Sequence, residues 1–434
     1  MRLITAVFVL FALFFEARVF AQIATFERPP INYLDAEVHD AVARLAVMVE
    51  TGEVQLEFDK RHGYLPSVLK ALEIPVSSQA LVFSKTSMQI HRISPSTPRA
   101  VYFNDNVYVG WCQRGEVLEF AATDPNQGAI FYSLKQIELE KPEFVRDRGQ
   151  CLTCHASSRT QNVPGYFVRS VFPDRSGQPE LGSGTFTTDQ TSPFDQRWGG
   201  WYVTGTHGKM RHMGNAIFKP NDSGLDRESG ANLHSLDGIV STRPYLSPHS
   251  DLVALLVLDH QTQMHNAITA ANFETRQALH QSHEMNDLLD RPPGHISDVA
   301  QRRIEAVADN LVTHLLMCDE FQLTDPVAGT SDFANEFSAH SVRDTKGRSL
   351  RDLDLQTRLF RYPCSFLILS EAFDALPNEV RNLAVRKVTE VLEGKDTSHK
   401  FAHLSAEMRR EILEILRETN PEFAREISES DPGN

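Results

Sequence analysis

The feature that most constrains the fold of this chain is a long irregular stretch between residues 144 and 249. It is rich in Gly, Pro, Ser, Thr and Asp, and its apolar residues follow neither helical nor strand spacing. So long a segment without regular elements is unusual inside a compact domain. We therefore expect something other than a regular apolar core to organise it, and a large buried cofactor would do so.

Within that stretch lies the run Cys151-Leu152-Thr153-Cys154-His155. In a C-x-x-C-H run the two thiols lie about one helical turn apart, so that both can add to the vinyl groups of one haem. The adjacent histidine then lies under the iron and supplies an imidazole nitrogen. The pattern occurs once, and we expect one covalent haem c with His155 as its iron ligand.

Three other interpretations of Cys151 and Cys154 compete with this one. A thioredoxin-like redox pair needs a βαβ context that the preceding residues do not indicate, and it does not need the histidine. A zinc site needs about four ligands, usually from a second such pair. A plain disulfide or a chance match remains. If haem uses both thiols, at most two of Cys112, Cys318 and Cys364 can pair, and Cys318 with Cys364 is one possible pair.

The run from Arg148 to His155 resembles the c-type cytochromes, and the resemblance extends to the tripeptide at residues 163–165. In that family a proline carbonyl downstream of the motif accepts a hydrogen bond from the proximal imidazole, so the resemblance implies this role for Pro164. A simple turn proline is the alternative. The whole chain resembles large bacterial proteins that contain a cytochrome c domain, although its long flanks depart from the small soluble cytochromes.

The second axial position of the iron has its first set of candidates in the loop at residues 198–215. Its glycines would let backbone approach a flat macrocycle closely. The candidate ligands, in order of preference, are Met213, Met210, His212 and His207. Aromatic side chains could line the ring face and arginines could pair with the propionates; these are Trp198, Trp201, Tyr202, Arg197 and Arg211.

A rival site lies further along the chain, on a predicted helix. His260 and Met264 are four residues apart and share a face of that helix, and His265 follows. Met264 is an alternative ligand, and His260 an alternative distal acid/base over an open iron position. The structural alternative is that these residues end a buried leucine stripe.

The N-terminus has the features of an export signal. Arg2 precedes an apolar run over residues 3–15, and residues 19–21 have the small or modest side chains of a cleavage site. The run is shorter than the ~20 residues of a spanning helix, and an uncleaved anchor is the alternative. We expect a mature chain from Gln22 in the periplasm or otherwise outside the cytoplasm, without stable membrane insertion.

Composition fits a soluble globular protein of more than one domain. The chain has 434 residues, of which 41% are hydrophobic and 23% charged. Its formal net charge of -14 argues against nucleic acid as a partner, because phosphate binding needs clustered Lys and Arg.

The fold class expected is mainly α with a small antiparallel β-meander, that is α+β, around a cytochrome c-like haem region with long loops. The meander covers residues 107–112, 116–121 and 129–134. Helices are expected at 35–50, 65–72, 250–282, 297–317, 378–392 and 405–418, with Asp35 and Ser250 as caps. The expected division is a signal peptide at 1–21, an α+β region at 22–143, the haem-binding region at 144–285, a helical region at 286–427 and a disordered tail at 428–434.

These features predict an exported monohaem c-type cytochrome that transfers electrons to or from a redox partner protein. One alternative is a peroxidase-like haem c oxidoreductase with an open or displaceable sixth iron position. Another is a scaffold protein whose haem is structural. The identity of the sixth ligand separates a carrier from a catalyst.

Overall fold

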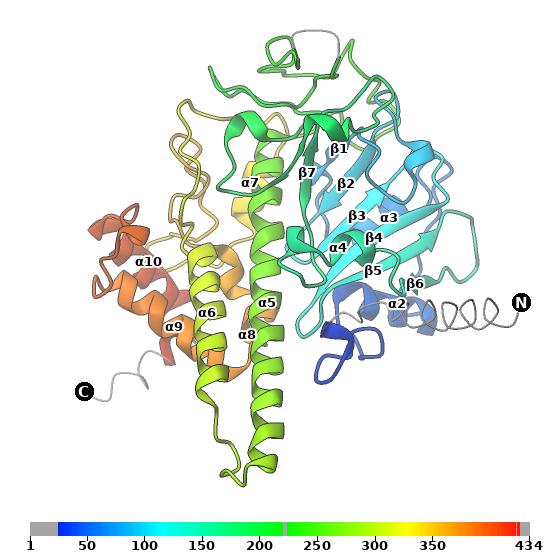
Figure 1. The fold of residues 1–434 in the computed structure, drawn as a ribbon. Coiled ribbons are helices and arrows are strands. Elements are labelled where there is room, and N and C mark those ends of the chain that lie inside the picture. Colours follow the sequence, from blue (N-terminus) through cyan, green and yellow to red (C-terminus); the bar gives the residue numbers. More distant parts are fainter. Residues whose placement is uncertain (1–24, 220–223, 422, 426–434) are drawn as a thin grey trace, which may run out of the picture.

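One long helix divides the molecule. The computed structural model describes residues 25–219, 224–421 and 423–425, so the predicted signal peptide and C-terminal tail lie outside the described residues. Helix α5 (Leu252–Leu288) has a β-sheet on one side and the C-terminal helices on the other (Figure 1). Nearly all of its first half is buried, because it packs against both parts.

The sheet is a six-stranded antiparallel meander in which each strand pairs with the next along the chain. It confirms the predicted α+β class and the three predicted strands, and it adds three more. The strands are β1 (Ala80–Val82), β2 (Arg99–Phe103), β3 (Val107–Trp111), β4 (Val117–Asp124), β5 (Gly128–Lys135) and β6 (Phe144–Arg146). A separate two-stranded sheet, β7 (Val168–Val171) with β8 (Thr185–Thr188), lies within the stretch expected to be irregular.

The two faces of the large sheet belong to different apolar cores. One face, with Tyr102, Val109 and Phe120, packs with the short N-terminal helices α2 (Ala41–Thr51) and α3 (Leu65–Ala71). The other face, with residues such as Val101, Phe103 and Phe131, shares a core with α5. Strands β1 and β3 bury every residue, as their apolar runs suggest, whereas β4 alternates buried and partly exposed residues over its first half and β6 has no buried residue.

Two helix caps differ from the sequence-based expectation. Asp40, not Asp35, caps α2 by accepting hydrogen bonds from Val42 N and Ala43 N. Asp251, not Ser250, caps α5 in the same way. The hydroxyl of Ser250 instead accepts from Leu81 N and donates to Tyr202 O, tying the sheet to the following loop. A carboxylate offers more acceptor sites than a hydroxyl, and Asp251 uses them on Thr330 and Ser331 as well.

The C-terminal part is helical, as the sequence predicts. The helices are α6 (Asp298–Leu315), α7 (Phe333–Ala339), α8 (Glu371–Asp374), α9 (Asn378–Leu392) and α10 (Ala406–Thr419). Helix α7 falls in a segment expected to be irregular. The remaining helical turns are α4 (Leu152–His155) and the 3-10 turns Thr25–Glu27, Val76–Ser78, Ile90–Arg92, Ser158–Thr160, Leu181–Ser183, Phe194–Gln196, Phe366–Leu369 and His399–Phe401.

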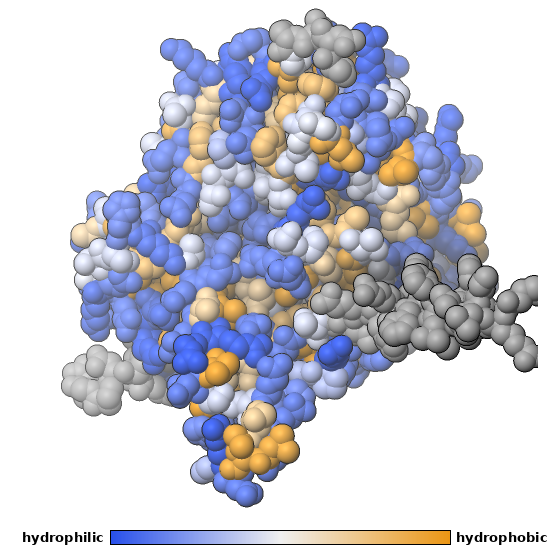
Figure 2. All heavy atoms as spheres, viewed as in Figure 1, coloured by the Kyte–Doolittle hydropathy of each residue, from blue (hydrophilic) through white to orange (hydrophobic). Residues whose placement is uncertain are grey.

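The surface is mostly hydrophilic (Figure 2). An apolar patch lies at the lower end of the view, where α5 ends, and its exposed residues are Met285, Leu288 and Leu289. Among the described residues, no helix combines the length and the apolar character needed to cross a bilayer.

Candidate haem site

The two cysteines of the C-x-x-C-H run lie on a single turn of helix, α4, between α5 and the sheet in the view of Figure 1. The turn is closed by hydrogen bonds from Cys154 N (3.1 Å) and His155 N (2.9 Å) to Cys151 O. The carboxylate of Asp147 accepts from Gly149 N and Cys151 N and so fixes the entry to the turn. Both thiols are free, with Cys151 half-buried and Cys154 exposed. Burial raises the pKa of the Cys151 thiol to about 12.

The imidazole of His155 is held in one tautomer by the backbone. Its Nδ1 lies 2.9 Å from the carbonyl oxygen of Gly165, and Gly165 N donates back to His155 O at 2.9 Å. A carbonyl can only accept, so Nδ1 carries the proton and Nε2 presents a lone pair. Within the described part of the chain, Nε2 has no hydrogen-bond partner. The acceptor is therefore Gly165 and not Pro164, whose carbonyl accepts from Ala129 N instead.

The ring of His155 packs against two phenylalanines. The centroids of Phe131 and Phe167 each lie 4.9 Å from that of the imidazole. Burial, together with the nearby guanidinium of Arg99, lowers the pKa of His155. The neutral imidazole is the form that ligates a metal, so this environment favours a ligand rather than an imidazolium.

Helix α5 fixes the segment that holds His155. The side chain of Asn266 accepts from Tyr166 N at 2.8 Å and donates to Tyr166 O at 2.7 Å. A Cβ at Gly165 would lie 2.1 Å from Asn266 Oδ1, so only glycine fits at this approach. The sequence analysis did not single out Asn266, which lies in a polar run of α5 that also contains Thr262 and Gln263 on the same side.

The loop expected to supply the sixth ligand is part of the interior. Arg197 forms a 3.0 Å ion pair with Asp259, and the indole N–H of Trp198 donates to the same carboxylate at 3.0 Å. Thr188 donates to its other oxygen. Burial raises the pKa of Asp259 to about 6 despite these partners. Arg197 and Trp198 therefore serve a buried polar network.

Among the histidines and methionines of the same loop, His207 and Met213 have hydrogen-bond partners, whereas Nδ1 of His212 is buried without one among the described residues. His207 donates from Nδ1 to Met210 O (2.7 Å) and accepts at Nε2 from Asn232 N (3.0 Å), which uses both ring nitrogens. The sulfur of Met213, a fully buried residue, accepts from Ser170 Oγ. His212 is buried, and burial lowers its pKa to about 3.

Two further candidates of this region are bound elsewhere. The indole N–H of Trp201 donates to Arg169 O at 2.9 Å. Arg211 makes a two-bond pair with Glu228, each bond 2.9 Å long. Among the described residues, no hydrogen bond or ring contact joins the loop at residues 197–213 to α4.

The rival candidates on α5 lie in the helical core. His260 Nε2 is 2.8 Å from Ser365 Oγ, and its ring packs edge-on against Phe360. Burial lowers the pKa of His260 to about 3. Met264 is fully buried, and His265 donates from Nε2 to Asp105 O. The structural interpretation of this stretch expected partly solvated histidines at the end of the leucine stripe, whereas His260 and His265 are fully buried.

The residues that do surround α4 come largely from upstream of the motif. The sulfur of Met88 lies 3.8 Å from Cys151 Sγ. Arg99 pairs with Glu119 at 2.7 Å, and its Nε is buried without a hydrogen-bond partner among the described residues. Arg169 bonds Thr185 through Nε. The sequence analysis sought ligands downstream of the motif, and no local pattern marks these side chains.

One face of the large sheet lies beside these residues. Val101, Gly110, Glu119 and Ser133 are directly opposite one another across β2 to β5, so their side chains share one face. Gly110 and Ser133 are the small residues of this row, and the Arg99–Glu119 ion pair lies over Gly110. Together with the free thiols, the lone pair of His155 and the unpartnered Arg99 Nε, this arrangement fits a covalently attached haem.

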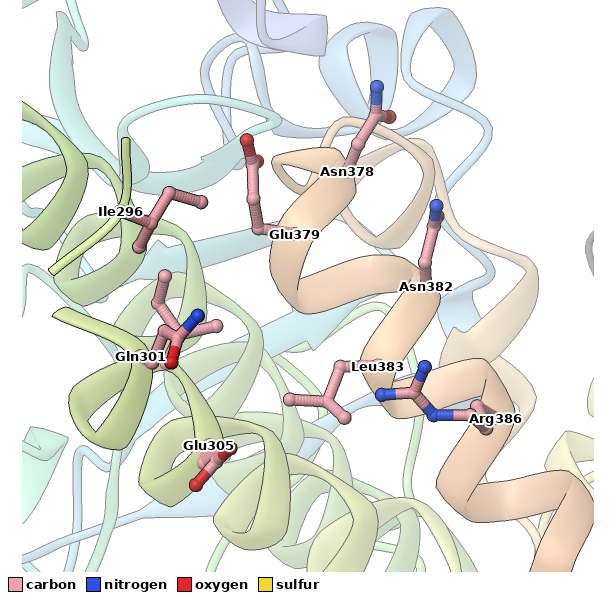
Figure 3. Close-up of a pocket in the computed structure, with 9 residues that line it drawn as sticks. Ile296, Gln301, Glu305, Asn378, Glu379, Asn382, Leu383 and Arg386 are labelled. Atoms are coloured by element: carbon pink, nitrogen blue, oxygen red, sulfur yellow. The ribbon is translucent and has the colours of Figure 1, made fainter. Parts of the chain in front are cut away.

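A hollow of about 450 Å³ lies between α6 and α9 (Figure 3). Its lining is polar and aliphatic and includes Glu305, Glu379, Leu383 and Arg386, none of which comes from α4 or the sheet. Among the described residues, no three His, Cys, Asp or Glu side chains gather closely enough to hold a metal ion. Cys318 and Cys364, a possible disulfide from the sequence, are separate buried thiols.

Comparisons of the chain with protein-family models, with curated proteins and with solved structures find no match.

Proposed function

We propose that this protein is an exported monohaem c-type cytochrome whose haem is attached through Cys151 and Cys154 and ligated by His155. The observation that carries the proposal is the state of His155 in this motif. Its Nδ1 donates to a fixed backbone carbonyl, and its Nε2 lone pair has no partner among the described residues. Hydrogen bonding of the remote nitrogen orients a ligand histidine and raises its basicity.

Haem c, when bound, supplies a one-electron couple whose potential depends on the axial ligands and their surroundings. The protein's residues would position and enclose it. Phe131 and Phe167 support the imidazole. Arg99 and Arg169 carry guanidinium groups suited to carboxylates such as the propionates. Arg197 and Arg211, expected in this role from the sequence, already pair with Asp259 and Glu228.

Two observations favour electron transfer over peroxidase chemistry. The partner of His155 Nδ1 is a neutral carbonyl, which makes the imidazole a weaker donor than a carboxylate partner would. His260, the candidate distal acid/base, bonds Ser365 among aromatic side chains of the helical core. Cys154 is exposed, so the attachment point lies at the surface, where a redox partner protein can approach.

Export is part of the proposal and rests on the predicted signal peptide at residues 1–21. Covalent haem attachment takes place outside the cytoplasm in bacteria, so the motif and the signal support each other. We infer a periplasmic or otherwise exported mature protein.

The test is expression of the full chain in a bacterial periplasm that contains the haem-attachment machinery. We expect a pyridine haemochrome spectrum of the c type, with haem that stays on the polypeptide after denaturation. The double variant Cys151→Ala/Cys154→Ala should lose it completely, whereas Cys112→Ala, which removes a thiol buried elsewhere, should keep it. Wild-type protein that matures without covalent haem would overturn the proposal.

A further inference from the structure

We propose that Met88 supplies the sixth iron ligand, an inference that rests on the proposed haem c function. Met88 Sδ lies 3.8 Å from Cys151 Sγ, which places a thioether beside one of the two attachment points. A thioether sulfur is a ligand for haem iron, and it raises the potential of the couple. Met88 was not among the candidates from the sequence because it precedes the motif.

The segment that carries Met88 is anchored on both sides. Before it, Ser84 N donates to Gly200 O (3.0 Å) and Lys85 N donates to Gly177 O (2.8 Å). After it, the amide of Gln89 donates to Glu119 (2.9 Å) and Val117 O (3.1 Å) and accepts from Glu116 N (2.9 Å). The side chain of Met88 is thus presented from a tethered turn rather than from a free loop.

The exposure of Met88 separates it from the methionines first considered. Its side chain is 55% exposed, whereas Met213 and Met264 are fully buried and Met210 is 7% exposed. Withdrawing a buried methionine from an apolar core costs free energy, because its side chain loses that burial. Moving Met88 towards a group on Cys151 carries no such cost, and contact with a macrocycle would cover apolar surface that is now in water.

Met88, which contacts Cys151, and His155 of the same motif come from different parts of the fold. Met88 lies between β1 and β2, while His155 follows β6 and is held by α5 through Gly165 and Asn266. Ligation by both would join the start of the sheet to the segment after its last strand. The two ligands would therefore act as a cross-link through the cofactor across the whole meander.

The experiment uses the holoprotein with covalent haem. Ferric wild-type protein is expected to show the weak near-infrared band of a methionine–iron bond. Met88→Leu should lose this band, lower the reduction potential and bind added imidazole or cyanide at least ten-fold more tightly. Met88→His should give the low-spin spectrum of an iron with two imidazole ligands. Because Met88 is exposed, neither change should impair folding.

Two control variants separate ligation from general effects. Met285→Leu alters a methionine of similar exposure at the end of α5, and Met213→Leu alters the candidate preferred from the sequence. Both should keep the band. A holoprotein that lacks the band, or a Met88→Leu variant that retains it, would overturn this inference and leave the cytochrome proposal intact. Absence of covalent haem in the wild type would instead overturn the cytochrome proposal.

Discussion

The turn α4 and the loop at residues 197–213 differ in how many of their side-chain atoms already have hydrogen-bond partners. The residue types alone do not show this difference. The loop contains the larger number of suitable side chains, with two histidines, two methionines, two tryptophans and two arginines. In the structure most of their donor and acceptor atoms already have partners. The surroundings of α4 contain fewer such residues, but His155 Nε2 has no hydrogen-bond partner among the described residues and Met88 is 55% exposed. A side chain can serve as a ligand only where packing and hydrogen bonds leave its donor atom accessible.

The largest expected effect tests whether the loop is structural. Asp259→Ala removes the partner of the buried Arg197 guanidinium and of the Trp198 indole. Breaking a buried ion pair from one side costs about 3–5 kcal/mol, so the free energy of unfolding measured with urea should fall by that amount. The exposed pair offers a matched control: Glu228→Ala should cost about 1 kcal/mol or less.

Haem attachment and the iron spectrum of the Asp259→Ala protein, measured at low temperature where it remains folded, should match the wild type. Loss of the axial methionine signature in this variant would show that the loop reaches the iron after all. An unchanged free energy of unfolding would show that the Arg197–Asp259 ion pair does not hold this loop in place.

The second prediction concerns the backbone acceptor of His155. Gly165→Ala places a methyl group against Asn266 and should destabilise the protein by about 1–3 kcal/mol. It should also weaken the His155 hydrogen bond, make the imidazole a poorer donor and so raise the reduction potential of the holoprotein. Pro164→Ala leaves both carbonyls in place and should have a much smaller effect on the potential. The reverse order of effects would restore Pro164 to the role implied by the family resemblance.

Features set by neighbouring residues could be predicted from the sequence, whereas contacts between residues far apart in the chain could not. Helix α9 matches its predicted bounds, Asn378–Leu392, and α6 begins one residue after its predicted start at Ser297, because periodicity is a local signal. Strands β1 and β6 have three residues each, too few to show a period; β2 is as long as the predicted strand β3 but was not predicted.

The candidate site was foreseen only in its covalent core, the C-x-x-C-H motif, whose chemistry is contiguous in sequence. The Met88–Cys151 contact spans 63 residues and the Asn266–Tyr166 contact spans 100. No spacing rule relates such pairs. The signal of a methionine near a glycine-rich loop favoured Met213, and the structure shows the sulfur of Met213 accepting a hydrogen bond from Ser170 on β7.

The third prediction uses pH to distinguish core from site. Burial holds the folded-state pKa of His260 at about 3, below the ~6.5 of an unfolded chain. The stability contributed by this neutral group is therefore complete above pH 6.5 and is lost as the pH falls towards 3, at about 1.4 kcal/mol per unit. His260→Gln should consequently be closer to the wild type in unfolding free energy at pH 5 than at pH 7, by about 2 kcal/mol. If the difference in unfolding free energy between wild type and His260→Gln is the same at pH 5 and pH 7, a buried neutral imidazole is contradicted.

The smallest expected effect is a shift in reduction potential, which we compare between variants of two arginines. Arg99→Gln removes a positive charge beside His155 and leaves Glu119 unpaired, which should lower the reduction potential measurably. Arg211→Gln breaks a surface pair with Glu228 and should leave the potential unchanged. Equal shifts in the two variants would place the propionates between the two regions rather than beside the sheet.

The hydrogen bond from His155 to Gly165 O also bears on how this protein can diverge. Every residue type has a carbonyl, so substitution cannot delete the acceptor itself. What selection can act on is the close approach to Asn266, which tolerates no side chain at residue 165. We expect homologous chains to vary freely at the proline yet keep a glycine ten residues after the motif histidine, together with a short amide opposite. The glycine at position 165 and the amide at position 266 would therefore identify relatives of this fold better than the proline of small cytochromes.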